Sequence, residues 1–218
     1  MTSKDIAHFT SIPWTRTLLT QPNLTTFTLA SRLSIPQDEP PDSITRRSQD
    51  ELVRRILNTP ETIPHILGFY TTPSSSSSTS TPNFPIDSCT ILFDLREGLK
   101  GYNGITHGGF LATLLDEGMG NLMVINRSYL SSLPPAKRKE VDVLNWEKNA
   151  MLTAGINLRY LSPIVLPNTV AVVTKVKGIE GRKVVFDVEI RTEGEVCVKA
   201  EGVWIAVPKS KVEGRMKL

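Results

Sequence analysis

The segment Thr106–Gly120, THGGFLATLLDEGMG, joins a histidine and two glycines to an apolar repeat that contains an acid pair. The apolar residues recur every three or four positions, as they do on the buried face of a helix: Phe110, Leu111, Leu114, Leu115, Met119, Leu122 and Met123. Asp116 stands inside this repeat, and a charge removed from water is costly unless it is paired or used. We therefore expect this helix to be the centre of the fold and the place to look for a functional site.

The bulk composition excludes several classes of protein. The 218 residues are 39% apolar and 22% charged, which is ordinary for a globular protein with one substantial core. The net charge of +3 is mild, so we expect no nucleic-acid partner. The longest apolar runs fall far short of the roughly 20 residues that a membrane-spanning helix needs.

The two cysteines, Cys89 and Cys197, are far apart and lie in apolar, strand-like stretches. No CxxC pair or Cys/His cluster occurs, so the sequence gives little support for a metal site, and we expect both to be buried free thiols. The start of the chain, MTSKDIAHFT, lacks the layout of a secretory signal. We expect an intracellular and most simply cytoplasmic protein, with a mitochondrial location as the alternative.

The first part of the chain divides into an extension and two strands. Residues 1–60 are expected to form an N-terminal extension, loosely structured over 1–47, with a short strand or turn near NLTTFTLASRLSI and one short helix over 49–58. Ser48 and Glu51 have the spacing of a capping box at the start of that helix. Residues 65–72 and 88–95 read as strands, and the serine tract between them predicts a flexible loop over 73–83.

After the central helix, residues 131–149 are polar and broken by prolines, which predicts an irregular connection. Four strands are then predicted over 150–161, 169–179, 183–192 and 195–207. One long helix beside an antiparallel sheet is an α+β architecture. We assign residues 61–210 to this domain and 211–218 to a C-terminal tail.

A second, thinner stripe on the helix carries small and polar residues: Gly109, Thr113, Asp116 and Gly120. At the helix start, free backbone N–H groups and the helix dipole favour developing negative charge, and glycine lets a ligand approach the backbone. His107 and Asp116 are nine residues apart, which places them about 13 Å apart on roughly opposite faces. If both act on one substrate, the acid comes from a second copy, which predicts a two-fold dimer. Asp116 as hydrogen-bonded structure at a dimer contact is the alternative.

The pattern GxxGxTHGGFLATLLDE resembles the signature of hotdog-fold acyl-CoA thioesterases, the PaaI-like branch of the 4-hydroxybenzoyl-CoA thioesterase superfamily. TAGINLRYLSP (153–163) resembles the segment that follows the helix in that family, and GRKVVFDVEI resembles a later strand pair. The likeness covers roughly Cys89 to Val207. It implies a hotdog fold, in which one antiparallel sheet wraps the long helix, and a homodimer or a dimer of dimers.

The resemblance also implies roles. Gly108 N–H would polarise the thioester carbonyl, His107 would orient the substrate, Asp116 of the other subunit would act as general base or nucleophile, and Thr153 would position the water. The substrate-binding residues carried over from the family are Asn103, Gly109, Tyr160, Ser162, Pro163, Lys177, Arg182 and Lys183, the last three as cations for coenzyme A phosphates. The implied activity is hydrolysis of acyl-CoA, and no metal or redox cofactor is implied.

One position departs from the family pattern. Many relatives carry an asparagine six positions before the histidine, where this chain has Gly101, and the nearest asparagine is Asn103. Either Asn103 takes the place of that asparagine through a shifted loop or its polar contact with the substrate is absent.

Two alternative functions are considered. The principal one is a non-catalytic hotdog protein that binds acyl-CoA or serves in assembly. A hotdog dehydratase lacks support, because the helix of those enzymes carries a different arrangement of histidine and acid.

Overall fold

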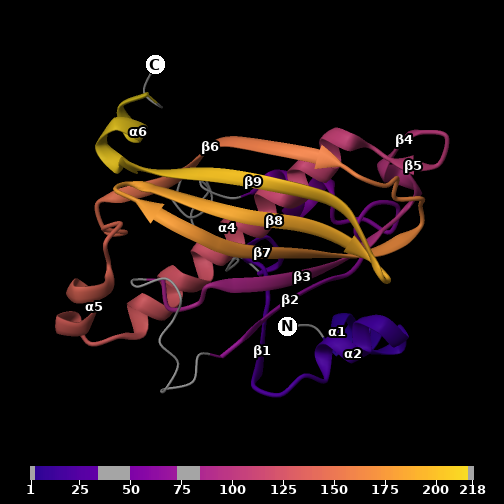
Figure 1. The fold of residues 1–218 in the computed structure, drawn as a ribbon, viewed down its shortest axis with the longest axis horizontal. Coiled ribbons are helices and arrows are strands. Elements are labelled where there is room, and N and C mark those ends of the chain that lie inside the picture. Colours follow the sequence, from indigo (N-terminus) through magenta and orange to yellow (C-terminus); the bar gives the residue numbers. More distant parts are fainter. Residues whose placement is uncertain (1–2, 34–49, 73–83, 216–218) are drawn as a thin grey trace, which may run out of the picture.

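A single long helix packed against one antiparallel sheet forms the centre of the molecule (Figure 1). The computed structural model describes residues 3–33, 50–72 and 84–215. Helix α4 runs over Gly108–Ser132 and lies across a seven-stranded sheet of order β1-β2-β3-β7-β8-β9-β6, in which every neighbouring pair is antiparallel. The expected α+β hotdog architecture is confirmed.

The strands have the following bounds: β1 Leu24–Phe27, β2 Ile66–Thr71, β3 Ser88–Leu95, β6 Asn149–Tyr160, β7 Asn168–Glu180, β8 Lys183–Thr192 and β9 Glu195–Pro208, with a small separate hairpin of β4 Lys100–Tyr102 and β5 Ile105–Thr106. The short helical turns are η1 Ala30–Arg32, η2 Leu52–Ile56 and η3 Glu97–Leu99. Among the described residues, no helix is long and apolar enough to cross a membrane.

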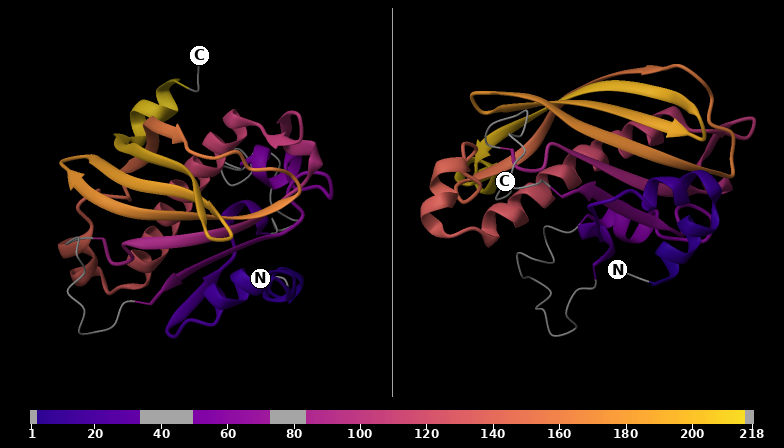
Figure 2. Two further views of the ribbon diagram at one scale, coloured as in Figure 1. Left: turned by 45° about the vertical axis from the view of Figure 1, so that its right-hand side comes forward. Right: turned by 60° about the horizontal axis from the view of Figure 1, so that its bottom comes forward.

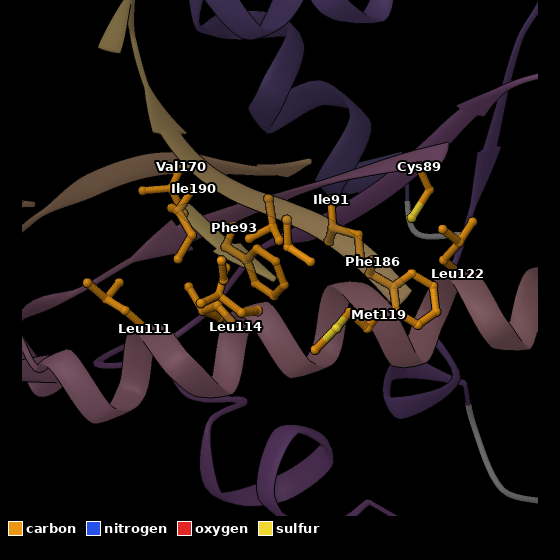
Figure 3. Close-up of a cluster of buried hydrophobic side chains, with 14 of the residues drawn as sticks. Cys89, Ile91, Phe93, Leu111, Leu114, Met119, Leu122, Val170, Phe186 and Ile190 are labelled. Carbon is orange, nitrogen blue, oxygen red and sulfur yellow. The ribbon is translucent and has the colours of Figure 1, made fainter. Parts of the chain in front are cut away.

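The predicted apolar stripe of α4 faces the sheet and forms the helix side of the core (Figure 3). Six of its seven residues are buried, and Phe110 is partly buried against the same cluster. The inner faces of β3, β7 and β8 supply the facing side chains, among them Phe93, Val170 and Phe186, none of which is exposed. Burial of this apolar surface is the main force that fixes the helix on the sheet and sets its rotation about its own axis.

Helix α4 approaches β7 so closely at Gly118 that only glycine fits. A Cβ added to Gly118 would lie 2.5 Å from the Thr174 hydroxyl oxygen and 2.8 Å from Val172 Cγ1. Both neighbours are fully buried in the sheet, so neither can turn away into solvent. The glycine therefore sets the distance between the helix and the sheet.

Two N-terminal helices, α1 Ser3–Ser11 and α2 Pro13–Leu19, correct the expectation of a loosely structured extension for residues 3–19. They lie on the β1–β3 side of the molecule, far from β6 (Figure 2). Phe9 is completely buried in a second apolar cluster with Leu67, Phe69 and Leu92. Since successive strand residues point to opposite faces, and Ile91 and Phe93 belong to the main core, this cluster covers the outer face of the same strands.

Three further expectations are revised. The helix predicted over 49–58 is a short turn of π type, η2. The Asp50 carboxylate accepts a hydrogen bond from Val53 N–H at 3.1 Å at its start. Ser48, the predicted capping residue, lies outside the described residues. The connection predicted as irregular contains helix α5, Pro135–Val141, and helix α6, Lys209–Arg215, follows β9. Residues 73–83, predicted as a flexible loop, also lie outside the described residues.

The contact at Gly118 gives a stability test. Gly118→Ala gains helix propensity but forces a methyl group into the Thr174 and Val172 side chains, so we expect a net loss of about 1–3 kcal/mol in unfolding free energy. Gly178→Ala in β7 is the matched control, because no atom lies within 4 Å of its added Cβ, and it should change stability by less than about 0.5 kcal/mol. Urea unfolding of the two variants measures the difference, and equal stabilities would contradict the close-approach argument.

Candidate functional site

The start of α4 is capped by its own histidine. His107 is the N-cap residue, and its Nδ1 accepts a hydrogen bond from Gly109 N–H at 3.0 Å. Its backbone N–H donates to Leu99 O at 2.9 Å, which fixes the entry of the chain into the helix. Because Nδ1 is an acceptor, the neutral ring carries its proton on Nε2. Gly108 is the first helical residue, where no intrahelical carbonyl can receive its N–H.

A pocket of about 360 Å³ opens beside this helix start. It is lined by Ile105, Thr106, Gly108, Leu111, Tyr160, Leu161, Ser162, Pro163 and Ile164. The Tyr160 hydroxyl donates a hydrogen bond to Gly108 O at 2.8 Å, and a Cβ added to Gly108 would lie 3.1 Å from that hydroxyl oxygen. The fold thus brings four of the residues singled out in the sequence to one place, and a side chain at position 108 would be in tight contact with the Tyr160 ring and hydroxyl.

Asp116 and Thr153 form the second part of the candidate site. The Thr153 hydroxyl donates a hydrogen bond to Asp116 Oδ1 at 2.7 Å, from the middle of β6 to the middle of α4. The pairing of β6 with β9 shifts register between Thr153 and Gly155, and such bulges redirect side chains next to functional sites. Asp116 is half-buried and Thr153 is exposed, so the hydroxyl orients a carboxylate that is only partly withdrawn from water.

The three cations carried over for coenzyme A phosphates lie elsewhere in the protomer. Lys177, Arg182 and Lys183 are exposed near the turn between β7 and β8, at the opposite end of the sheet from the start of α4 (Figure 1). Lys177 pairs with the carboxylates of Glu201 and Asp187. The hydrogen bond with Glu201 is the largest cause that raises its pKa. One protomer therefore does not bring these cations to the pocket beside Gly108.

Two other candidate residues have structural roles of their own in the protomer, Asn103 in a hairpin turn and Ser162 in a hydrogen bond. Asn103 occupies the tip of the β4–β5 hairpin with φ +49°, followed by Gly104 with φ +77°, which is the geometry of a tight hairpin turn that Asn-Gly favours. Its side chain is exposed. The Ser162 hydroxyl is hydrogen bonded to Glu195. The Asn-Gly pair was a readable hairpin signal that the sequence analysis did not use.

Glu117, the other half of the acid pair, points to a different environment. Burial and, to a smaller extent, the neighbouring carboxylates of Asp50 and Asp116 together raise its pKa to about 7, against the opposing hydrogen bond from Asn121. The Asn121 amide donates to the Glu117 carbonyl oxygen at 2.9 Å and lies 3.4 Å from its carboxylate. Adjacent residues of one helix are about 100° apart, so the two carboxylates face different surroundings.

The raised pKa of Glu117 predicts a pH-dependent stability. Its unfolded value is about 4.3, so between about pH 4.5 and 7 the folded protein holds a proton that the unfolded chain has released. Stability should therefore fall as the pH rises through this window and level off above it. Glu117→Gln removes the buried charge, and we expect it to be more stable than the wild type by about 1–3 kcal/mol at about pH 8, with the gain vanishing toward pH 4. Urea unfolding at both pH values is the measurement, and a gain independent of pH would contradict the assignment.

Comparison with known proteins finds proteins that are similar to this helix and the following strands. Residues 103–199, a little under half of the chain, match the family model described as the thioesterase superfamily. The chain is 32% identical over 134 residues to verlamelin biosynthesis protein B of a Lecanicillium species, and the match covers 58% of each protein. It is 31% identical over 110 residues to acyl-coenzyme A thioesterase THEM4 of Xenopus laevis, covering 50% of this chain and 40% of that one.

The chain thus spans little more than half of the first relative's length and less than half of the second's. Among solved structures, a hypothetical thioesterase from Streptococcus pneumoniae, determined with coenzyme A, superposes with a TM-score of 0.43 and 20% identity. That match covers 56% of this chain and 82% of the other.

Proposed function

Because residues 103–199 match the model of the thioesterase superfamily, we propose that the protein hydrolyses an acyl-CoA thioester to the free acid and coenzyme A. In this proposal Asp116 of one subunit activates the attacking water, or attacks the carbonyl itself, and Gly108 N–H of the other subunit polarises the carbonyl. The observation that carries the proposal is the hydrogen bond between Thr153 and Asp116, which fixes the carboxylate at an accessible place midway along α4.

The start of α4 supports the electrophilic role. A thioester carbonyl gains negative charge when it is attacked, and backbone N–H groups aimed at that oxygen stabilise the charge. Gly108 N–H stands at the positive end of a 25-residue helix and borders the pocket that also contains Tyr160 and Pro163. His107 uses Nδ1 to hold the helix start, which leaves its exposed Nε2–H free to orient the substrate.

The free edge of β6 supports the dimer that the proposal requires. Among the described strands β6 pairs only with β9, so its other edge offers unpaired backbone groups, and Leu152 and Tyr160 are 43% and 54% exposed. Two copies joined antiparallel along this edge would be related by a two-fold axis. For Asp116 of one copy to meet Gly108 of the other, the axis has to pass midway between Thr153 and Tyr160, which are the strand residues that contact them.

The same arrangement would recruit the distant cations. Antiparallel joining sets the β7–β8 end of one copy beside the helix start of the other, because the two sheets run in opposite directions. Lys177, Arg182 and Lys183 of one subunit would then flank the pocket of its neighbour and could hold the phosphates of coenzyme A. Within this proposal, Asn103 and Gly109 belong to the rim of the carbonyl site.

The first test separates a thioesterase from a binding module. Purified protein is assayed with acyl-CoA substrates of several chain lengths, and released thiol is detected with a disulfide reagent, since both cysteines are buried and add no background. We expect Asp116→Asn to lower kcat at least about 100-fold, because it removes the general base. Glu117→Gln is the matched control and should stay near the wild-type rate. Absence of activity toward every chain length would favour a non-catalytic acyl-CoA-binding protein.

The second test concerns the backbone donor and its sharing between subunits. Gly108→Pro deletes the N–H at the first helical position, where proline is tolerated, and the ψ of 127° at His107 suits a residue before proline. Gly108→Ala adds a similar contact with Tyr160 but keeps the N–H. We expect Gly108→Pro to reduce kcat about 100-fold more than Gly108→Ala does.

Co-expression of Asp116→Asn with Gly108→Pro then tests the shared site. Random pairing makes half of the dimers mixed, and each mixed dimer keeps one intact site, so about a quarter of the wild-type activity should return. Failure of the mixture to exceed either variant alone, with dimers present, would show that each site draws on a single subunit.

A further inference from the structure

A cluster of histidine and carboxylate side chains lies outside the superfamily match, where the N-terminal helices meet the sheet. His8 of α1, His65 just before β2 and Asp94 of β3 bring their donor atoms within 4.8 Å of one another. Asp5, three residues before His8 on α1, is hydrogen bonded to His65 Nδ1 at 2.9 Å. Three segments distant in sequence thus gather two imidazoles and two carboxylates, although no His/Cys motif marks them in the sequence.

The His8 Nε2 atom is the unusual member of this cluster. It is buried and lies 3.2 Å from Asp94 Oδ2, yet it makes no hydrogen bond. The Asp94 side chain is only 5% exposed, so water does not separate the two. A buried polar atom without a partner costs free energy, and a cation bound between Nε2 and the carboxylate would supply that partner.

We propose that His8, His65, Asp94 and Asp5 bind a divalent transition-metal ion, for which Zn²⁺ is the best match. Imidazole and carboxylate are ligands of Zn²⁺, which holds four of them tetrahedrally at about 2.0–2.2 Å. Donors around such an ion are about 3.4 Å apart, so His8 and Asp94 already have this spacing and the widest pair of the cluster has to approach by up to about 1.4 Å. The two rings are stacked within 13° of parallel with centroids 4.1 Å apart, and one ring turns so that both lone pairs point at the ion.

The surroundings of the cluster offer the ion access from solvent and hold one of the proposed ligands, Asp94, by a hydrogen bond. A pocket of about 410 Å³ reaches Asp5 and His65. Arg96 donates from Nη2 to Asp94 Oδ2 at 2.6 Å, as outer-shell groups do toward ligating carboxylates. Arg96, together with Lys4 and Arg32 on the pocket wall, also opposes a cation. We therefore expect binding weaker than that of dedicated structural zinc sites.

The bound ion would fasten the extension to the thioesterase sheet. His8 and Asp5 belong to α1, whereas His65 and Asp94 belong to the sheet side, so an ion joins the two bodies next to the apolar contact of Phe9. An ion that binds only the folded arrangement stabilises it by mass action. This inference does not depend on the proposed hydrolysis, because the cluster and the start of α4 are made of different residues.

Calorimetric titration of Zn²⁺ into metal-free, full-length protein tests the site. We expect one ion per chain, and a loss of affinity of at least about tenfold in each of His8→Gln and His65→Gln. The chain has three histidines, so His107→Gln is the matched control and should bind Zn²⁺ as the wild type does. No uptake by the wild type would overturn the site. Equal uptake by a His8→Gln/His65→Gln double variant would mean an adventitious ion only and would overturn it as well.

A measurement on the unaltered protein guards against variants that simply loosen α1. In NMR spectra of the wild type, Zn²⁺ should shift the imidazole signals of His8 and His65 together and leave those of His107 in place. A shift of His107 alone, or of none of the three, would overturn the proposal.

Discussion

The rotational setting of α4 on the sheet is the constraint on which the rest of the structure depends. Burial of the stripe from Leu111 to Met123 leaves the helix one way to face the sheet, and Gly118 fixes how near it can come. Every other side chain of α4 then has a determined direction. Asp116 is turned toward β6 and Glu117 toward a buried environment beside Asp50, because one residue along a helix is about 100° around it.

This setting gives two adjacent carboxylates different chemistry. Asp116 meets a hydroxyl group at the exposed edge of the sheet, which orients the charged form without burying it. Glu117 is withdrawn from water, and its pKa rises to about 7. Asp116 is thus the member of the pair that a ligand at the edge of the sheet can reach, and Thr153 orients it. The proposed site uses Asp116 for this reason.

The N-terminal extension is a layer of the fold. Strands β2 and β3 are apolar on both faces, and helices α1 and α2 cover the outer face with Phe9 at the centre of the contact. The strands β8 and β9 instead alternate buried and more exposed residues along part of their length, and β6 has no fully buried residue. One half of the sheet is thus closed by the chain itself, whereas β6 keeps a free edge, where the proposed dimer would form.

The sequence by itself determined the central helix and the main strands, because their periodicity reports them directly and they were predicted close to their observed bounds. The helices α1, α2, α5 and α6 were not predicted, since they are short. The sequence also singled out Gly108 and Asp116, since glycines at a helix start and an acid in an apolar stripe stand out from their neighbours. Only the tertiary structure decided which residues meet. The Thr153–Asp116 bond, the Tyr160–Gly108 contact and the His8–His65 cluster join segments tens of residues apart, and no local pattern encodes such a distance.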